Sequence, residues 1–412
     1  YRATLEERHS TRGRGNALRL ALTGQLPLSS PSHTPWDDPA TIATLDLCLS
    51  CKACKSECPS NVDVARLKAE YTAQRYRATG RIPLQARVVG HIRRLNALGS
   101  MMPGIANFVG TLPPIRGAMN RLLGFAPQRT LPTFATSLYR WFRRRPSRAT
   151  HPPVPAAAGR QPRVVLFGDC FVTYNEPEIG RQAVALLEAL GYAVDFPRVG
   201  CCGRSMISTG LLAEAIRSAD QVLTQLAPFI ADPAVKAIVV CEPSCLSAMR
   251  DDWLSLKLQT PLAVRRELAA KAMLVEEFIE RFWDGHPRTP RLKTPAAAGA
   301  PVVYHGHCHQ KSLWGTKTSA SLLKRLLGER LTVLPSGCCG MAGAFGYSKD
   351  HYDLSMKIGE QSLFTLLRDV PQDAVVLASG TSCRHQIKDG AARRAVHPVT
   401  LLAELLDCSP PA

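Results

Sequence analysis

The sequence predicts a multidomain protein in which a helical N-terminal domain precedes two copies of an α/β domain with a parallel sheet. Three observations lead to this prediction. Apolar residues recur with helical spacing through the first third of the chain, short β-branched segments alternate with longer helical ones after it, and that alternation occurs twice in the same order. Two stretches rich in Ala, Gly and Pro separate the three parts.

The first predicted domain covers residues 1–145 and is helical, with breaks at Gly and Pro as in "MMPGIANFVG" and "TLPPIRGAMNRLLGF". Of the formal net charge of +18, residues 1–160 carry +16, from 24 Lys and Arg against 8 Asp and Glu. Such a basic surface suits an acidic protein partner, an anionic membrane or nucleic acid. No helix-turn-helix, zinc-finger or aromatic-platform pattern accompanies the charge, so we expect no nucleic-acid binding.

Residues 146–162 form the first linker, and an α/β pattern follows over residues 163–285. Its strands and helices are expected, in order, at "RVVLFGDC", "EIGRQAVALLEALGY", "AVDFP", "GLLAEAIRSADQVLTQLAPF" and "VKAIVVCEPSC". After a second linker at residues 286–300, the same order recurs over residues 301–408 as "VVYHGHC", "KTSASLLKRLLGER", "LTVLP", "DLSMKIGEQSLFTLLRDV" and "DAVVLASGTSC". The recurrence predicts an internal duplication.

The cysteines repeat together with the secondary structure. Cys170 precedes a Cys-Cys pair by 31 residues and Cys308 precedes another by 30, and Gly follows each pair, as in "GCCGRSM" and "GCCGMAG". A further cysteine follows each pair after 43 residues in the first repeat and 44 in the second. All fall just past the carboxyl ends of expected strands, where open parallel sheets bind ligands, so we expect one site in each repeat. The two sets are Cys170, Cys201, Cys202 and Cys245, and Cys308, Cys338, Cys339 and Cys383.

The helical domain contains a third group of cysteines, in "CLSCKACKSECP". Cys48, Cys51, Cys54 and Cys58 follow the spacing C-x2-C-x2-C-x3-C-P of bacterial ferredoxins, in which the first three thiolates bind one [4Fe-4S] cluster and the fourth ligates another. Zinc usually takes paired C-x2-C knuckles with a longer loop between them, so the run favours an iron-sulfur cluster. The chain has no second run, so on this pattern the fourth ligand of the cluster on Cys48, Cys51 and Cys54 is expected from elsewhere. The alternatives are a single cluster closed by Cys58 and a three-iron cluster.

The ferredoxin run followed by two CCG repeats resembles the iron-sulfur module of FAD-linked oxidases and D-2-hydroxy acid dehydrogenases. That family includes the glycolate oxidase iron-sulfur subunit, the anaerobic glycerol-3-phosphate dehydrogenase C subunit, lactate utilization protein A and heterodisulfide reductase subunits. The opening "YRATLEERHSTRGRGNALRLALTG" looks most like the long single-chain members, in which an FAD-binding domain and a first cysteine run precede this phrase. The resemblance implies that the chain begins inside a longer polypeptide. It also implies that an upstream cysteine completes the cluster of Cys48, Cys51 and Cys54, while Cys58 belongs to the upstream cluster.

The resemblance further implies an α-helical ferredoxin-like domain followed by two duplicated α/β CCG domains, each binding a cluster through its cysteines. It adds Cys241 to the ligand candidates of the first repeat. The second repeat differs, because Ser379 stands where the first has Cys241, and it therefore offers four thiolates, which suffice for a cubane. The alternatives for the cysteine pairs are inert buried thiols, a zinc site and a vicinal disulfide between Cys201 and Cys202.

The function implied is electron transfer. In the family, FAD on an upstream domain or partner subunit takes a hydride from a 2-hydroxy acid, and [4Fe-4S] clusters pass the electrons to a quinone, cytochrome or other carrier. No FAD fingerprint is visible in this chain, so we expect no dehydrogenase activity from it alone. The rival interpretations are a heterodisulfide-reductase-like enzyme that reduces a disulfide at a CCG-bound cluster, and a structural zinc protein.

Several other residues are secondary candidates. His305, His307 and His309 flank Cys308 at alternating positions and are expected either to ligate or tune a metal or to act as hydrogen-bonding neighbours. Arg204, Arg250 and Arg384 follow cysteine motifs, where an arginine can stabilise charge on a cluster or lie at the surface. Cys408 lies outside the repeat pattern and is expected to be a bystander.

The expected location is the cytoplasm, with peripheral attachment to the inner face of the cytoplasmic membrane as an alternative. No apolar run reaches the roughly 18 to 20 residues that span a bilayer, and no signal peptide is visible. Because the 14 cysteines are clustered and no export signal accompanies them, they favour metal or redox chemistry over disulfides. The stretch "SLYRWFRRRP", with Trp141 and Phe142, is expected to meet a membrane or acidic partner, or to pack its aromatic rings inward.

Overall fold

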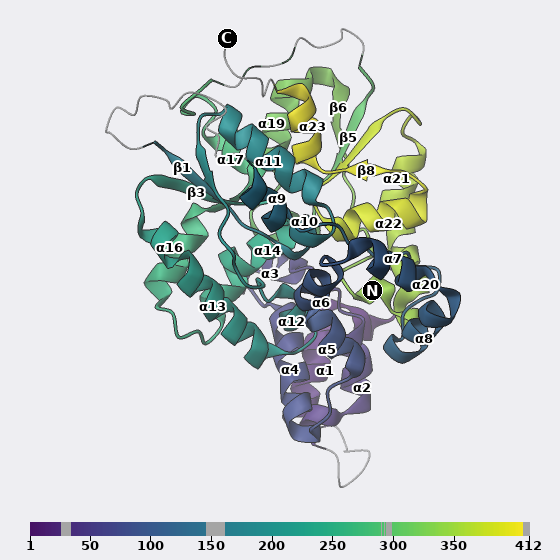
Figure 1. Ribbon diagram of the computed structural model, residues 1–412. Coiled ribbons are helices and arrows are strands. Elements are labelled where there is room, and N and C mark those ends of the chain that lie inside the picture. The colour runs from purple at the N-terminus through teal and green to yellow at the C-terminus, as the bar shows by residue number, and fades with distance from the viewer. Residues whose placement is uncertain (26–33, 146–160, 290, 292, 294–298, 407–412) are drawn as a thin grey trace.

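A computed structural model describes residues 1–25, 34–145, 161–289, 291, 293 and 299–406 of the chain (Figure 1). Cys408, most of the first predicted linker and about half of the second lie outside these residues, so the predictions made for them stay predictions. The described chain forms a helical N-terminal part and two α/β units, each built on its own parallel sheet (Figure 1).

The N-terminal part is helical, as its periodicity predicts; its likeness to ferredoxin stays a prediction. Side chains and backbone-restricted residues define several helix ends. Asp38 and Asp63 accept hydrogen bonds from backbone amides in the first turns of α2 and α4, and α4 ends at Gly80, whose φ is 66°. The helices are α1 (Thr11–Leu22), α2 (Pro39–Asp46), α3 (Ala53–Glu57), α4 (Val64–Thr79), α5 (Leu84–Gly90), α6 (Ile92–Gly99), α7 (Pro103–Thr111), α8 (Pro113–Leu123) and α9 (Leu138–Arg144), with 3-10 turns η1 (Glu7–His9) and η2 (Pro35–Asp37).

The first α/β unit has a four-stranded parallel sheet in the order β2-β1-β3-β4. Its strands are β1 (Arg163–Leu166), β2 (Ala193–Asp195), β3 (Val235–Val240) and β4 (Ala272–Leu274). Its helices are α10 (Cys170–Tyr174), α11 (Pro177–Ala189), α12 (Arg204–Ser208), α13 (Leu212–Ala231), α14 (Pro243–Ser247), the π-helix η3 (Ala248–Asp252), α15 (Trp253–Ser255), α16 (Leu262–Lys271) and α17 (Val275–Arg281).

The second α/β unit repeats this topology with the order β6-β5-β7-β8. Its strands are β5 (Val302–His305), β6 (Leu331–Val333), β7 (Val375–Ala378) and β8 (Ala395–Val396). Its helices are α18 (Cys308–Leu313), α19 (Lys317–Leu327), α20 (Tyr352–Gly359), the π-helix η7 (Glu360–Phe364), α21 (Thr365–Arg368), α22 (Thr381–Ala391) and α23 (Pro398–Leu405), with 3-10 turns η4 (Gly328–Arg330), η5 (Phe345–Tyr347) and η6 (Lys349–His351).

Matching sheet orders confirm the predicted parallel α/β class, and the duplication is visible in the topology. The sequence pattern predicted three strands in each repeat, and the structure adds a fourth at one edge, β4 and β8. These edge strands have three and two residues, too few for strand periodicity to stand out.

The two α/β units pack against each other by exchanging their last helices. Helix α23 of the second unit packs on α11 of the first, and α17 of the first packs on α19 of the second (Figure 1). One continuous apolar core results, because Leu322, Val399 and Leu402 of the second unit join the cluster that covers one face of the first sheet. Helix α9 packs on the same core, with Trp141 and Phe142 half-buried against it, so the aromatic rings of "SLYRWFRRRP" face inward.

A buried carboxyl group lies in the contact between the two units. Glu276, in the first turn of α17, is fully buried and accepts a hydrogen bond from Ser379 Oγ at 3.1 Å. Burial raises its pKa to about 7, because a carboxylate loses its hydration there. The protonated acid is therefore favoured in the folded protein relative to the unfolded chain.

The substitution Glu276→Gln should remove a pH dependence of stability. Because the folded pKa lies above the unfolded one, Glu276 lowers the free energy of unfolding progressively as the pH rises from about 5 through 7. Relative to wild type, Glu276→Gln is expected to be more stable by about 2 to 3 kcal/mol at pH 8 and nearly equal at pH 4.5, measured by chemical denaturation. Glu267→Gln, at an exposed position of α16, is the matched control. A wild-type minus variant difference that stays constant with pH would contradict the assignment.

Candidate functional site

Four cysteines of the first α/β unit lie together at the carboxyl end of its sheet. Cys170 begins α10 after β1, Cys201 and Cys202 follow β2, and Cys245 lies in α14 after β3. The Sγ atoms of Cys170 and Cys201 are 3.9 Å apart, and those of Cys202 and Cys245 are 3.1 Å apart. All four are buried and none forms a disulfide. Four convergent soft donors in a buried site match the ligand set of an iron-sulfur cluster, and also that of zinc.

The second unit gathers its cysteines at the equivalent place. Cys308 begins α18 after β5, Cys338 and Cys339 follow β6, and Cys383 lies in α22 after β7. Cys339, Cys383 and His305 each present a ligand atom, and these three atoms lie within 4.8 Å of one another. Hydrogen bonding to Cys338, together with burial, raises the pKa of Cys308 well above its usual value. The structure thus brings the four predicted thiols of this repeat into one region, in which Cys339 and Cys383 are buried and Cys308 and Cys338 are partly exposed.

The Gly after each Cys-Cys pair aims a backbone amide at sulfur. Gly203 N donates to Cys201 Sγ at 3.5 Å, and Gly340 N donates to Cys338 Sγ at 3.3 Å. Gly340 has a φ of 91°, and a Cβ there would lie 2.2 Å from Ser355 O, so only glycine fits. N–H groups directed at sulfur stabilise a thiolate over a thiol, which is the form that binds a metal.

Cys241, the fifth candidate of the first repeat, lies elsewhere. It is fully buried in the apolar cluster on one face of the first sheet, whereas Cys202 and Cys245 pack in the cluster on the other face. Its carbonyl accepts a hydrogen bond from His397 Nε2 at 3.0 Å, in the contact between the two units. The structure does not bring Cys241 to the other four thiols, and its role as a ligand stays a prediction.

An arginine of the helical part reaches the first cysteine group. Arg93, on α6, lies with Nη1 4.0 Å from Cys170 Sγ, and its guanidinium donates to Gly168 O and Val199 O at 2.7 Å each. A buried cation beside sulfur favours the anionic form of the thiol and of any cluster bound to it. Sequence reasoning missed Arg93, because nothing in its local pattern distinguishes it from the other arginines of this domain.

The ferredoxin run packs on the second unit. Helix α3, which contains Cys54, lies against α18, and Ser312 Oγ of α18 donates to Cys51 O at 3.0 Å. Burial and the nearby Cys308 and Cys48 thiols raise the pKa of Cys51 to about 12. Cys58 follows the last residue of α3 and is partly exposed. The run and the second cysteine group therefore lie next to each other.

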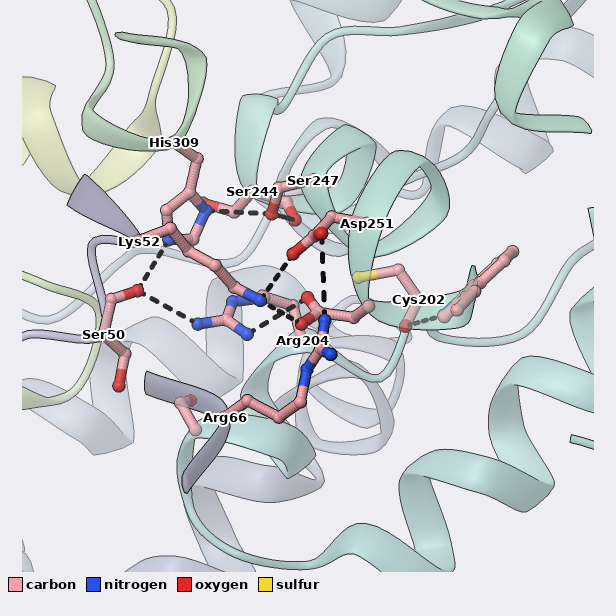
Figure 2. Close-up of polar contacts among 12 residues, drawn as sticks. Ser50, Lys52, Arg66, Cys202, Arg204, Ser244, Ser247, Asp251 and His309 are labelled. Carbon is pink, nitrogen blue, oxygen red and sulfur yellow. Dashed lines mark hydrogen bonds and ion pairs between the residues drawn. The ribbon is translucent and has the colours of Figure 1, made fainter. Parts of the chain in front are cut away.

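Between Cys51 and Cys54, a buried lysine fastens the run to the first unit. Lys52 has a φ of 67° and is 1% exposed. Its Nζ lies 3.1 Å from an oxygen of Asp63, 2.7 Å from one of Asp251 and 2.6 Å from one of Asp252 (Figure 2). Although burial alone would lower it, these carboxylates raise the pKa of Lys52, so the ammonium stays charged. Asp251 and Asp252 end the π-helix that follows Cys245 and α14.

The same network includes two of the secondary candidates (Figure 2). Arg204 pairs with Asp252 at 3.2 Å and donates to Ser50 O at 3.3 Å. His309 contacts Ser50 O through Nε2 at 3.0 Å and Ser247 Oγ through Nδ1 at 2.9 Å. The segment that contains the ferredoxin run, the first α/β unit and the second α/β unit therefore meet at Ser50, the residue before Cys51.

The two remaining arginine candidates make structural contacts. Arg250 pairs with Glu277 at 3.0 Å, and its guanidinium carbon lies 5.2 Å from the centroid of the Trp314 ring. Arg384 forms an ion pair with Glu176 and donates to Ser379 O at 2.7 Å, in the contact between the two units. Among the described contacts of these two arginines, none is with a cysteine sulfur.

Comparisons with known proteins agree with this arrangement. Residues 164–250 and 302–388 each match the model of the cysteine-rich domain named CCG. The anaerobic glycerol-3-phosphate dehydrogenase C subunit from Escherichia coli K12 is 30% identical over 356 residues, which cover 84% of this chain and 83% of that protein. Lactate utilization protein A of Geobacillus kaustophilus is 31% identical over 192 residues, 44% of this chain and 74% of that protein.

A longer relative is D-2-hydroxyglutarate dehydrogenase from Escherichia coli K12, 24% identical over 367 residues. The match covers 87% of this chain but 34% of that protein, so the chain spans about a third of its length. No solved structure matches the chain.

Removing the buried ammonium should destabilise the protein strongly. Lys52→Met would leave the carboxylates of Asp63, Asp251 and Asp252 without their shared cation, and we expect a loss of about 3 to 5 kcal/mol in the free energy of unfolding. The measurement is denaturant unfolding of the two variants side by side. Lys257→Met, at an exposed position of the first α/β unit, is the matched control and should change stability by less than about 0.5 kcal/mol. Equal stability of the two variants would contradict the role given to Lys52.

Proposed function

Because the chain belongs to the family of CCG cysteine-rich domain proteins that includes the anaerobic glycerol-3-phosphate dehydrogenase C subunit, we propose that it is an iron-sulfur electron-transfer module. In this proposal it serves an FAD-dependent 2-hydroxy acid dehydrogenase. The observation that carries the proposal is the convergence of four buried, unpaired thiols in the first α/β unit, Cys170, Cys201, Cys202 and Cys245. Two of the relatives described above bear the name of a dehydrogenase or of its subunit, which supports a redox role.

Three cluster sites are proposed. One [4Fe-4S] cluster would be held by the four convergent thiols of the first unit, and a second by Cys308, Cys338, Cys339 and Cys383 of the second unit. A ferredoxin-type cluster would be held by Cys48, Cys51 and Cys54, with its fourth ligand and the partner cluster of Cys58 still predictions. Such clusters accept and release electrons one at a time.

The protein's contribution would be to bind the clusters, exclude water from them and set their charge. The cysteines of both α/β units other than Cys308 and Cys338 are buried, which keeps bulk water away. The amides of Gly203 and Gly340 and the guanidinium of Arg93 supply hydrogen bonds and positive charge next to sulfur. The flavin itself would lie on an upstream domain or a partner subunit, and a quinone, cytochrome or other carrier would be the acceptor.

Peripheral attachment to a membrane is part of the proposal, and an exposed apolar surface supports it. Within the described residues, no helix is both long and apolar enough to cross a membrane. Helices α6 to α8 and the turns between them nevertheless expose large apolar side chains to solvent, far more than scattered surface residues would. These side chains are Leu95, Leu98, Met101, Met102, Ile105, Phe108, Val109, Ile115 and Leu122.

The charge around this surface suits an anionic bilayer. Residues 84–124, which cover α5 to α8, contain no Asp or Glu, and of their five arginines Arg87, Arg94, Arg116 and Arg121 are at least partly exposed. Apolar side chains flanked by cations bind the interface of membranes that contain acidic lipids, through insertion and through electrostatic attraction. This surface replaces "SLYRWFRRRP" as the proposed contact, because Trp141 and Phe142 pack inward.

Metal analysis tests the electron-transfer proposal. Anaerobically purified protein is expected to contain iron and acid-labile sulfide in equal amounts, about four of each per cluster. Cys51→Ser should abolish the EPR signal of the ferredoxin-type cluster in the reduced protein, and Cys202→Ser should lower the iron content by about one cluster. Cys408→Ser, outside every cysteine motif, is the matched control and should leave both unchanged. Zinc without iron or sulfide would contradict the proposal.

Vesicle cosedimentation tests the membrane contact. We expect the protein to bind vesicles that contain phosphatidylglycerol and to bind pure phosphatidylcholine vesicles far more weakly, since its charge would be unmatched there. The double variant Leu98→Ser, Phe108→Ser should weaken binding at least about tenfold, because each exposed side chain contributes 1.5 to 3 kcal/mol or so when it is buried in lipid. Leu262→Ser, exposed on α16 away from this surface, is the control. Unchanged binding of the double variant would contradict the contact.

A further inference from the structure

The two cysteine groups differ by a histidine. Around the first cysteine of each unit the chain reads "FGDCF" in the first and "HGHCH" in the second, so His305 stands where the first unit has Phe167. Phe167 packs in the same apolar cluster as Cys202 and Cys245. The equivalent position of the second unit is therefore directed at its cysteine group, and there it carries an imidazole.

In two of the three histidines of "HGHCH", both ring nitrogens already have a hydrogen-bonding partner. His307 accepts a hydrogen bond from His309 N through Nδ1 at 3.2 Å, which caps α18, and its Nε2 contacts Ser244 Oγ at 3.4 Å. His309 uses Nδ1 for Ser247 Oγ and Nε2 for Ser50 O. Neither ring has a nitrogen left for a metal.

In His305, only one ring nitrogen has a described hydrogen-bonding partner. Its Nδ1 lies 2.6 Å from Ser336 Oγ, and the side chain is 1% exposed. Among the described residues, no hydrogen bond to its Nε2 is present, while the ring contributes a ligand atom within 4.8 Å of the sulfurs of Cys339 and Cys383. A histidine that is fixed through Nδ1 and leaves Nε2 free is the usual arrangement of a metal ligand.

The second unit also has one thiol fewer than the first. Ser379 takes the place of Cys241, and its hydroxyl donates to Glu276 in the contact between the units, so it does not reach the cysteine group. Among the described residues, the imidazole of His305 at the end of β5 is thus the one further metal ligand that this site offers beside its thiols.

We propose that His305 ligates the iron-sulfur cluster of the second α/β unit through Nε2, beside Cys339 and Cys383, and replaces one of the two partly exposed thiolates, Cys308 or Cys338, in the ligand set proposed above. The inference rests on the proposed function. A neutral imidazole in place of an anionic thiolate makes a cluster less negative and raises its reduction potential. The second unit therefore holds the cluster of higher potential, and the first unit, with thiolates alone, the cluster of lower potential.

The test uses the full chain, purified anaerobically from cells grown with ¹⁵N-labelled histidine. Pulsed EPR of the reduced wild-type protein should show a strong coupling to a ¹⁵N nucleus bound to iron. His305→Phe, which installs the residue of the first unit, should lose this coupling and shift one midpoint potential to a more negative value, since a fourth thiolate can then bind. His351→Gln, at a histidine that pairs with Asp46, is the matched control and should keep the coupling.

Each outcome decides between the two proposals. Full iron content without a ¹⁵N coupling in the wild type overturns ligation by His305 and leaves the electron-transfer function standing. A coupling that persists in His305→Phe also overturns the assignment to this residue. Protein without iron and sulfide overturns the proposed function together with the inference. The wild-type spectrum needs no variant, so misfolding of His305→Phe cannot hide a negative result.

Discussion

The position of the ferredoxin run depends on one buried ammonium group. Lys52 Nζ is shared by three carboxylates, one from the helical part and two from the π-helix that follows Cys245. Lysine suits this place because a compact point charge can face three carboxylates at once, whereas a planar guanidinium pairs with one or two. Burying these charges carries a desolvation penalty, so the network contributes specificity of position rather than net stability. The Lys52 network binds the ferredoxin run to the first unit and so positions Cys51 and Cys54 against the second unit.

The two α/β units share a topology but have diverged at their ligand ends. Their sheets have equivalent strand orders, and the Gly after each cysteine pair directs its amide at sulfur in both. The differences lie in loops and strand ends, where His305 replaces Phe167 and Ser379 replaces Cys241. These positions lie at or just past the carboxyl ends of strands, where open parallel sheets bind ligands, so a change there alters the site while the strand order stays the same.

Much of this arrangement could be predicted from the sequence, because the relevant signals are local or periodic. The strand and helix alternation predicted the parallel sheets, and nearly equal cysteine spacing predicted two equivalent groups, whose thiols the structure places together. Arg93 and the partners of Lys52 could not be predicted, since they reach their sites from distant parts of the chain. The position of Cys241 could not be predicted either. Cys241 is only four residues before Cys245, but it directly follows β3, and the alternation of side chains along that strand puts it on the face of the sheet opposite to Cys245.

The exchange of terminal helices bears on how the duplication arose. In each unit the first crossover helix is covered by the last helix of the other, α23 on α11 and α17 on α19. A single copy of this domain would expose the first crossover helix to solvent, and a second copy of the same domain could cover that helix. The contact is reciprocal, with equivalent helices of the two units exchanged, which is the arrangement of an isologous dimer interface within one chain. Because the two units belong to one chain, a mutation can change one cysteine site without changing the other. Two sites that were equivalent can then differ in chemistry, so that electrons pass preferentially from one site to the other.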